Sequence, residues 1–302
     1  MAEPLIECVP NFSEGRRPEV VAALAETIAR VPGVYMLDSQ MDPDHHRSVI
    51  TFVGSPDGVV EAAFRAAALA ARQIDLEQHH GQHPRIGATD VIPFVPLRDA
   101  TLEDCVLLAR RLGQRLGDEL QIPIYLYEAA ATRPERVNLA DIRRGGYERL
   151  KQQIGVDLER RPDFGPATLG SAGATAVGAR QPLIAYNIFL QTSDVNIARQ
   201  VARAIRHSSG GLRYCKALGL LVGGRAQVSI NVTDFHRTPV HQIFELVRVE
   251  AAQYGVMPAE SEVIGLIPHD ALIAAAEYYL HLNMFRREQI LEDRITAALA
   301  AE

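Results

Sequence analysis

A short polar segment carries the residues of this chain that are best suited to proton transfer. It reads HHGQHPRIGATD, begins at His79 and runs into a predicted strand. Pro84 fixes its own φ angle and restricts His83 to extended geometry. Gly81 and Gly87 permit left-handed turns and the close approach of a ligand. Because imidazole titrates near neutral pH, a rigid loop of this composition suits general acid–base catalysis, and a merely polar surface loop is the alternative.

The same histidines could instead bind a metal ion. Half of the ten histidines lie in two short groups: His45, His46, His79, His80 and His83. His79 and His83 are four residues apart, which is the spacing of a zinc-binding pair on a helix. Gly81 and Pro84 argue against a helix, however, and no glutamate follows His79 as in HExxH zinc enzymes. We therefore expect acid–base chemistry and no metal site.

A second polar segment, VPNFSEG, connects a predicted strand to a predicted helix at residues 9–15. Helix N-termini offer free N–H donors and favour anionic groups, so Asn11, Ser13 and Glu14 are candidate ligand-binding residues. Arg16 stands where a capping box would need Glu or Gln, so capping alone does not explain these polar residues. An ordinary strand-to-helix loop is the alternative.

The segment RRPDFGPATLGSAGATAVGAR, residues 160–180, differs from the rest of the chain in its many small residues. It has four glycines, two prolines and no helical or strand periodicity. No GK[ST] follows it and no clear strand precedes it, so it is neither a P-loop nor a dinucleotide-binding fingerprint. A flexible connection between domains is the favoured interpretation, and a loop that cradles a ligand is the alternative.

Lys216 is unusual in a chain whose basic residues are almost all arginines. It lies in the predicted strand YCKAL, where it could face an anionic ligand. An exposed face of a sheet is the simpler interpretation.

The composition is that of an ordinary globular protein, with 47% hydrophobic and 23% charged residues. A net charge of −6 gives no broad attraction to nucleic acid or to an anionic membrane. Three cysteines, far apart and without a CxxC pair, argue against a disulfide framework or a zinc–thiolate site. The first residues, MAEPLIECVP, lack the pattern of a signal peptide, and no apolar run approaches the ~20 residues of a membrane span. We therefore expect a cytoplasmic protein.

Two similar series of predicted elements position these segments. The first series has strands at residues 5–10, 34–38, 47–53 and 90–95, with helices at 18–30 and 55–74. The second has strands at residues 183–191, 214–222, 227–234 and 262–267, with helices at 194–206 and 239–254. Each series reads βαββαβ, which is the order of the ferredoxin-like unit.

We therefore predict an α/β (α+β) fold with two ferredoxin-like βαββαβ subdomains, at residues 1–180 and 181–302. Helices would cover one face of each antiparallel-rich sheet, and a ligand would bind in the groove between the two sheets. The first subdomain would also hold a helix capped by Thr101, a strand at 123–127 and one or two helices within 139–154.

Several segments resemble the glutamate formimidoyltransferase family, which in animals forms the N-terminal half of formiminotransferase–cyclodeaminase. The similar segments are IECVPNFSEG, HHGQHPRIGATDVIPFVPL, PIYLYEAA, PDFGP, GARQPLIAYNIFL, AQVSINVTDF and SEVIGLIPHDALI. The similarity runs from about Leu5 to about residue 300, and the combination of HxGxHPRxGA with VPNFSEG is specific. The cyclodeaminase half has no counterpart in this sequence.

The resemblance implies transfer of the formimino group of N-formimino-L-glutamate to N5 of tetrahydrofolate, a step of histidine degradation. Tetrahydrofolate would be a co-substrate bound between two α/β subdomains, with no metal expected. The family's catalytic histidine, the one before Pro-Arg, falls on His83. Its folate-binding stretch falls on residues 163–173, which include Asp163, Phe164, Gly165, Pro166, Ala172 and Gly173. The resemblance also implies a homodimer and allows a separate cyclodeaminase partner.

This chemistry suits the residues at hand. One imidazole near neutral pKa can take the proton that N5 loses and return it to the departing glutamate nitrogen, which is the role we expect for His83, with His79 as its loop neighbour. Arg85 or Arg47 could bind a substrate carboxylate, since bidentate geometry favours arginine, and Lys216 could meet the glutamate tail of the folate.

One departure and three alternatives accompany this interpretation. Animal relatives carry an aspartate where Gln40 stands, and Asp42 and Asp44 lie close by. Some family members move a formyl group from 5-formyltetrahydrofolate instead. A metal-dependent formiminoglutamate hydrolase using His79, His83 and His45 or His46, or a non-catalytic folate-binding protein, are the remaining readings.

Overall fold

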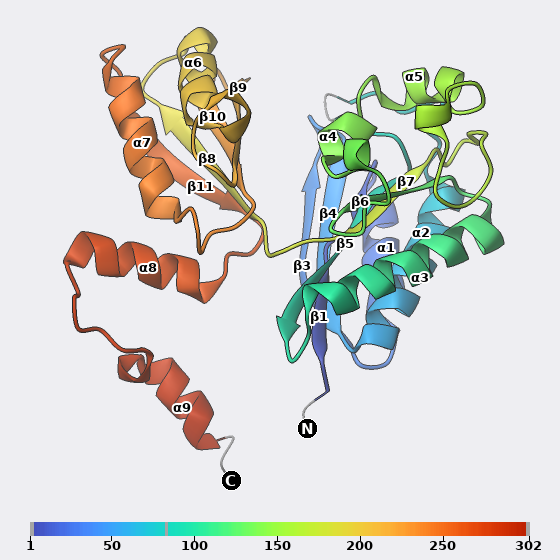
Figure 1. The fold of residues 1–302 in the computed structure, drawn as a ribbon, viewed down its shortest axis with the longest axis horizontal. Coiled ribbons are helices and arrows are strands. Elements are labelled where there is room, and N and C mark those ends of the chain that lie inside the picture. The colour runs from blue at the N-terminus through green and yellow to red at the C-terminus, as the bar shows by residue number, and fades with distance from the viewer. Residues whose placement is uncertain (1–2, 82–83, 300–302) are drawn as a thin grey trace. The chain divides into compact units, whose positions relative to one another are not determined.

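The computed structural model describes residues 3–81 and 84–299. The chain divides into two compact units, Met1–Gln181 and Pro182–Glu302, here unit 1 and unit 2. Each unit contains a sheet covered by helices, as the ribbon in Figure 1 shows.

Unit 1 is built on a seven-stranded sheet. Its strands are β1 (Leu5–Cys8), β2 (Asn11–Phe12), β3 (Val34–Asp42), β4 (Arg47–Gly54), β5 (Thr89–Arg98), β6 (Ile124–Glu128) and β7 (Thr175–Ala179). Its helices are α1 (Pro18–Ala29), α2 (Pro56–Gln73), α3 (Leu102–Leu120), α4 (Leu139–Ile142) and α5 (Gly146–Gln153), with short 3-10 turns at Pro134–Arg136 and Leu158–Arg160.

The first strand of this sheet is interrupted. Pro10 lies between β1 and β2 and has no N–H to give to a ladder, although its carbonyl accepts the Ile50 N–H. Both pieces pair antiparallel with β4 on one side and β5 on the other, and β3 pairs antiparallel with β4. These strands with α1 and α2 therefore form a ferredoxin-like βαββαβ unit.

The sheet continues beyond β5 in a way that the sequence did not predict. β7 lies between β5 and β6 and is parallel to both. All five of its residues are buried, and they lack alternation because a parallel strand covered on both faces has no solvent side. The interpretation of residues 160–180 as a flexible connection between domains is therefore wrong, since this segment enters the sheet of unit 1.

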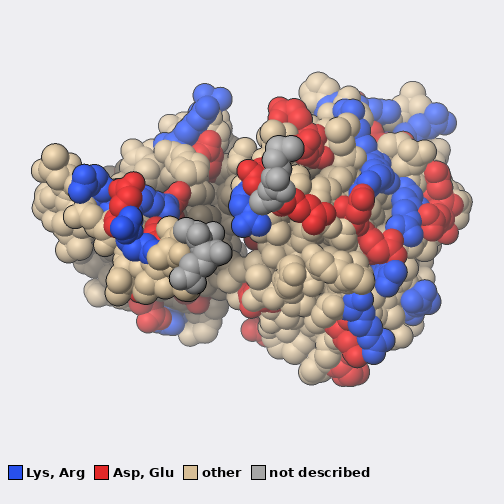
Figure 2. Space-filling model, turned by 90° about the horizontal axis from the view of Figure 1, so that it is seen from below, with Lys and Arg blue, Asp and Glu red and all other residues tan. Residues whose placement is uncertain are grey.

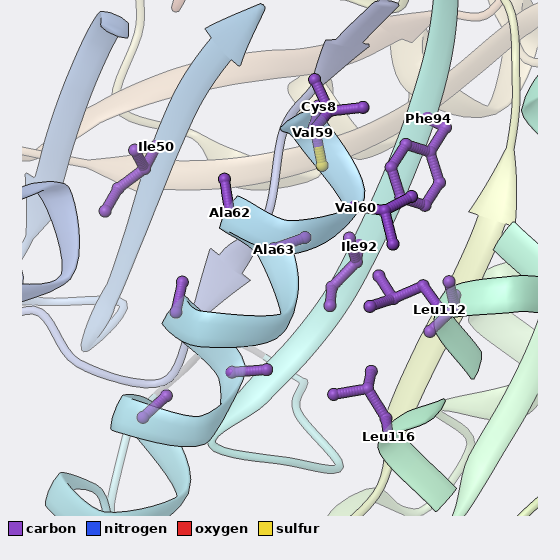
Figure 3. Packing of buried hydrophobic residues seen from close by; sticks show 14 of the residues in the cluster. Cys8, Ile50, Val59, Val60, Ala62, Ala63, Ile92, Phe94, Leu112 and Leu116 are labelled. Carbon is purple, nitrogen blue, oxygen red and sulfur yellow. The ribbon is translucent and has the colours of Figure 1, made fainter. Parts of the chain in front are cut away.

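Helices α1, α2 and α3 cover one face of this sheet. Along α2 the alanines Ala62, Ala63, Ala66, Ala67 and Ala70 are at most 1% exposed. Their small side chains let the helix approach the sheet closely, where Figure 3 shows Val59 and Val60 beside Ile92 and Phe94, with Leu112 of α3 completing the layer. Ser55 caps α2 and Thr101 forms a capping box with Asp104 on α3, as expected from their positions.

The opposite face of β5, β6 and β7 has a smaller core of its own. Val91, Tyr125 and Ala176 pack there against Ile142 of α4 and Leu150 of α5. The short helices α4 and α5 are thus fixed over this face of the sheet, in the same small core as Ile86.

Unit 2 repeats the ferredoxin-like order. Its strands β8 (Ile184–Leu190), β9 (Cys215–Val222), β10 (Arg225–Val232) and β11 (Pro258–Ile264) pair antiparallel in the order β11-β8-β10-β9. Its helices are α6 (Val195–Ile205), α7 (Val240–Ala252), α8 (His269–Leu280) and α9 (Leu291–Leu299), with 3-10 turns at His207–Ser209 and Arg287–Gln289. α6 and α7 pack on one face of the sheet through residues such as Val201 and Val247.

The two units confirm the predicted α/β fold with two ferredoxin-like subdomains, while the ligand groove between the sheets stays a prediction. Among residues 3–81 and 84–299, no helix is both long and apolar enough to span a bilayer. On the face drawn in Figure 2, basic and acidic side chains are interspersed rather than separated by sign.

Candidate functional site

Three chain segments meet at the end of β2. Ser13 donates its N–H to the Ala88 carbonyl at 2.9 Å and its hydroxyl to the Gly87 carbonyl at 2.7 Å. On the other side, Ala88 donates its N–H to the Ala172 carbonyl at 2.8 Å. The predicted site residues Ser13 and Ala172 are therefore brought together, although 159 positions separate them in the sequence.

Two glycines make this meeting possible. A Cβ on Gly87 would lie 1.9 Å from the Ala174 carbonyl oxygen, and a Cβ on Gly173 would lie 2.2 Å from the Ile86 carbonyl oxygen. Gly173 also has a positive φ of 69°, which other residues rarely adopt. The close contact of the two backbones thus requires glycine at both positions.

Arg85 is clamped from two sides. Its Nε donates to His79 Nδ1 at 2.9 Å, and its Nη2 donates to the His79 carbonyl at 2.8 Å. Glu148 of α5 accepts from Nη2 at 2.8 Å and from Nη1 at 3.2 Å, which lowers the pKa of its carboxyl. These bonds fix the Arg85 guanidinium against the loop, and its expected role as a substrate-carboxylate ligand stays a prediction.

His79 is buried, with 4% of its surface exposed. Burial lowers the pKa of its imidazole, and the neighbouring His46 and Arg85 charges act in the same direction. Its Nδ1 accepts the Arg85 Nε–H, and its Nε2 lies 3.0 Å from the His46 carbonyl oxygen. Both ring nitrogens therefore have protein partners, and His79 offers no lone pair to a metal ion.

Glu14 connects the VPNFSEG loop to the start of α1. Its Oε1 accepts the N–H groups of Arg16 and Arg17, and its Oε2 is paired with the Arg17 guanidinium at 2.5 Å. Burial alone would raise the pKa of Glu14, but these donors together lower it. Helix α1 has no side-chain cap at Arg17, and the N–H groups that Glu14 accepts precede the first helical residue, Pro18, so helix capping does not account for Glu14, as the sequence indicated. Asn11 donates to the carbonyl of Val9 at 3.1 Å.

His46 links Glu14 to the histidine segment. Its ring stacks on that of His79, with centroids 4.1 Å apart and an interplanar angle of 11°. Its Nδ1 lies 3.1 Å from the His80 carbonyl oxygen and its Nε2 lies 3.3 Å from Glu14 Oε1. The adjacent His45 is instead paired with Asp42 at 2.5 Å within the turn before β4.

Asp90 fixes the chain just after Arg85. Its carboxylate is 2% exposed and accepts the Ile86 N–H at 2.7 Å. The same carboxylate is paired with Arg143, which follows α4. Arg47 lies near this pair, because Phe12 of β2 pairs with Ser48 on one side and with Thr89 on the other. Burial and then the charge of Arg143 lower the pKa of Arg47, while the charges of Asp42 and Asp90 counteract that shift. Arg47 and Asp90 therefore share one end of the sheet.

The predicted folate-binding stretch has two ends in different surroundings. Asp163 accepts the Leu126 N–H at 2.8 Å and is paired with buried Arg136 at 2.5 Å, so its carboxylate holds the fold, while its contact with folate stays a prediction. Phe164 and Gly165 pack against Gly117 of α3, where a Cβ would lie 2.9 Å from the Phe164 Cβ. Half-buried Pro166 follows them. Ala172 and Gly173 lie instead beside residues 86–88.

Two further predicted site residues lie outside the described part of unit 1. Lys216 belongs to unit 2, where it lies on β9 opposite Asn231 of β10. His83, the expected acid–base group, lies outside the described residues. Its described neighbours in sequence belong to the cluster built around His79 and Arg85.

No group of three or more His, Cys, Asp or Glu side chains is arranged to hold a metal ion within residues 3–81 and 84–299. The partners of His79 described above also argue against the hydrolase reading that used His79 as a ligand. Sequence reasoning missed Glu148, Arg143 and the part played by His46. No spacing within a motif could have revealed them, because each lies 34 to 63 positions in the sequence from the residue that it contacts.

Comparison with known proteins decides the family. The formiminotransferase domain, N-terminal subdomain, matches residues 5–180, and the formiminotransferase domain matches residues 185–300. The chain belongs to the formiminotransferase family. This confirms the resemblance seen in its motifs, and the geometry above is thus the geometry of a member of that family.

Curated relatives of the family match nearly the whole chain. It is 50% identical to a glutamate formimidoyltransferase of Thermoplasma acidophilum over 99% of both chains. It is 46% identical to a glutamate formimidoyltransferase of Streptococcus pyogenes, covering 96% of this chain and 98% of that one. It is also 43% identical to the formimidoyltransferase-cyclodeaminase of Mus musculus, of which it covers 52%.

Proposed function

We propose that this chain is a glutamate formimidoyltransferase that moves the formimino group of N-formimino-L-glutamate to N5 of tetrahydrofolate in histidine degradation. The observation that carries the proposal is the 50% identity to a glutamate formimidoyltransferase over 99% of both chains. The HxGxHPRxGA and VPNFSEG segments support it, because their residues form one hydrogen-bonded cluster in unit 1.

The reaction exchanges one carbon–nitrogen bond for another. N5 of the folate forms a bond to the formimino carbon and loses a proton, and the bond to the glutamate nitrogen breaks as that nitrogen gains a proton. His83 is the residue that we propose to carry this proton, on the strength of its place before Pro-Arg. An imidazole can accept and return a proton near neutral pH, so one group serves both steps.

Arg47 is our candidate for the carboxylate of formiminoglutamate. It opens β4 against Gly15, where a Cβ would lie 2.5 Å from the Arg47 nitrogen, so it is close to the Ser13–Gly15 turn. Its half-buried side chain lies in the field of a second cation, Arg143, and a substrate carboxylate would add negative charge beside the two. Arg85 is the other candidate, and Glu148 and His79 already hold its guanidinium.

We propose that tetrahydrofolate contacts the later part of residues 163–173, beginning after Gly165, and Lys216 of unit 2. A Cβ on Gly170 would meet no atom within 4 Å, so there is open space beside this part of the segment. The Lys216 ammonium is the group that would meet the anionic glutamate tail of the folate. This assignment also rests on a ligand groove between the two subdomains.

We further propose that the enzyme is a cytoplasmic homodimer, with formiminoglutamate and tetrahydrofolate as its small-molecule partners. Support for a dimer comes from α8 and α9, where Leu280, Leu291 and Leu299 are 65%, 67% and 68% exposed. Exposed apolar side chains in such numbers favour contact with another surface. A separate cyclodeaminase is a second proposed partner, since in the mouse relative the printed name joins the two activities.

The test is release of glutamate from formiminoglutamate in the presence and absence of tetrahydrofolate. We expect release only when the folate is present, and a loss of about 10²–10⁴-fold in kcat for the His83→Ala variant. The His207→Ala variant, which changes an exposed histidine of unit 2, is the matched control. Release without folate, together with bound zinc or manganese, would favour a hydrolase instead.

A further inference from the structure

The two stacked histidines of unit 1 have different hydrogen-bonding surroundings. His79 Nδ1 faces a donor, the Arg85 Nε–H at 2.9 Å, and so must act as an acceptor. His79 Nε2 faces an acceptor, the His46 carbonyl at 3.0 Å, and so must carry a proton. These two partners are satisfied together only by the neutral imidazole with its proton on Nε2.

His46 faces acceptors on both sides. Its Nδ1 lies 3.1 Å from the His80 carbonyl oxygen, and its Nε2 lies 3.3 Å from a carboxylate oxygen of Glu14. Both contacts are hydrogen bonds only when the ring carries two protons. Glu14 is itself 1% exposed, so its negative charge is directed to Arg17 and His46.

The backbone supports this arrangement. His46 has a positive φ of 52°, which is uncommon for a histidine and has to be held by its contacts. A Cβ on Gly81 would lie 2.6 Å from the His45 carbonyl oxygen and 2.8 Å from the His46 Cβ, so the turn before β4 packs directly on the histidine segment. The stack therefore joins β4, the Glu14 loop and residues 79–81.

We propose that His46 and His79 form a pair with a fixed division of charge, His46 protonated and His79 neutral, and that His79 is a positioning residue for residues 85–90 rather than a proton donor in the reaction. The functional half of this proposal rests on the proposed transferase activity. The charged groups that face the pair are Glu14, Arg85 and, through Arg85, Glu148 of α5.

The physical basis is the cost of breaking a satisfied buried network. A proton on His79 Nδ1 would be directed at the Arg85 Nε–H and would place a second cation against that guanidinium. Loss of a proton from His46 would leave an acceptor facing an acceptor, either at Glu14 or at the His80 carbonyl. The protonation of each ring is thus fixed by its own pair of partners, and the stack holds the two rings in register with those partners.

The charge division is tested without any assay of activity. In protein labelled with ¹⁵N-histidine, we expect the His79 resonances to show an unprotonated Nδ1 and a protonated Nε2 at every pH from 6 to 8, and the His46 resonances to show two protonated nitrogens at pH 6. His79→Asn and His46→Asn variants assign the signals, and asparagine also tolerates the positive φ of His46. A proton on His79 Nδ1, or a neutral His46 at pH 6, would overturn the proposal.

The positioning role is tested by amide hydrogen exchange of residues 85–90 and of Tyr147. The Ile86 N–H is bonded to Asp90, and the Arg85 carbonyl accepts the Tyr147 N–H at 2.9 Å, so these amides report on the segment. We expect exchange at least about tenfold faster in His79→Asn than in wild type. The control is His80→Ala, which keeps the carbonyl that His46 uses. Equal exchange in His79→Asn and His80→Ala would contradict the positioning role.

Kinetics then separate positioning from proton transfer. For His79→Asn we expect kcat to fall about 10- to 100-fold with the pH profile of kcat/KM unchanged in shape, since misplacement slows turnover without removing a titrating group. Loss of one limb of that profile would mean that His79 itself transfers the proton. If wild type shows no folate-dependent transfer, the proposed function fails, while the resonances and the exchange rates still decide the structural proposal.

Discussion

Asp90 offers the sharpest test of how the site is held. Its carboxylate is 2% exposed and is shared between the Ile86 N–H and the guanidinium of Arg143, whose side chain is 14% exposed. An Asp90→Asn substitution keeps an oxygen for Ile86 but removes the charge. The positive charges of Arg143 and Arg47 would then repel each other without the negative charge of Asp90 to offset the repulsion.

The size of the effect follows from this burial. Removing one partner of a buried ion pair costs about 3–5 kcal/mol, and the remaining amide and the partial exposure of Arg143 place the expected loss near the lower limit, at about 3 kcal/mol. In a unit of this size each kcal/mol lowers the Tm by roughly 2–4 °C. The transition of unit 1 in differential scanning calorimetry should therefore fall by about 6–12 °C.

Asp141→Asn is the matched control for this prediction. Asp141 is also paired with an arginine, Arg144, but the two side chains are 38% and 69% exposed. Exposed pairs contribute less than about 1 kcal/mol, so the Tm should change by no more than a few degrees. If Asp90→Asn lowered the Tm no further than Asp141→Asn, the account of Asp90 as a buried anchor would be refuted.

Three further predictions concern the same unit. Gly87→Ala should destabilise it by about 3 kcal/mol in urea unfolding, because the new Cβ would lie 1.9 Å from the Ala174 carbonyl, whereas Gly170→Ala, with nothing within 4 Å, should be tolerated; equal losses would contradict the close contact. Burial lowers the pKa of His79 below its usual 6.5, so the unfolded chain takes up a proton there first and stability should fall as the pH drops below 6.5. In urea unfolding between pH 5 and 7.5, the free energy of unfolding should change less steeply with pH in His79→Asn than in wild type. An equally steep pH dependence in the variant would contradict the lowered pKa of His79. Thr101→Ala should cost about 1 kcal/mol by removing the capping box of α3, and no loss in the same assay would show that the box does not stabilise the helix.

The sequence predicted best those elements whose ends are marked by local chemistry. Ser55, Thr101 and Asp194 lie at the predicted starts of α2, α3 and α6, and each side chain accepts an N–H from the first turn of its own helix. The start of each helix is therefore marked by residues that are close together in the sequence. The βαββαβ order of both units followed from counting these elements. In contrast, β11 begins four residues before its predicted start, at Pro258, because its residues are mostly exposed and show no apolar alternation.

The parts that were missed depend on contacts between distant segments. β7 has no alternation because both of its faces are covered, so its small residues looked like a linker. Arg85 looked free to bind a carboxylate because its partner Glu148 lies 63 residues away. Asp163 likewise looked like a ligand contact, and only the fold shows that Arg136 and the Leu126 N–H occupy it.

The central claim is that this chain transfers a formimino group by means of His83. The most direct measurement is the rate of glutamate release from formiminoglutamate, with and without tetrahydrofolate, for wild type, His83→Ala and His207→Ala. The account predicts release that requires the folate, a fall of about 10²–10⁴-fold for His83→Ala and no change for His207→Ala. A folded His83→Ala protein that turns over at nearly the wild-type rate would contradict it.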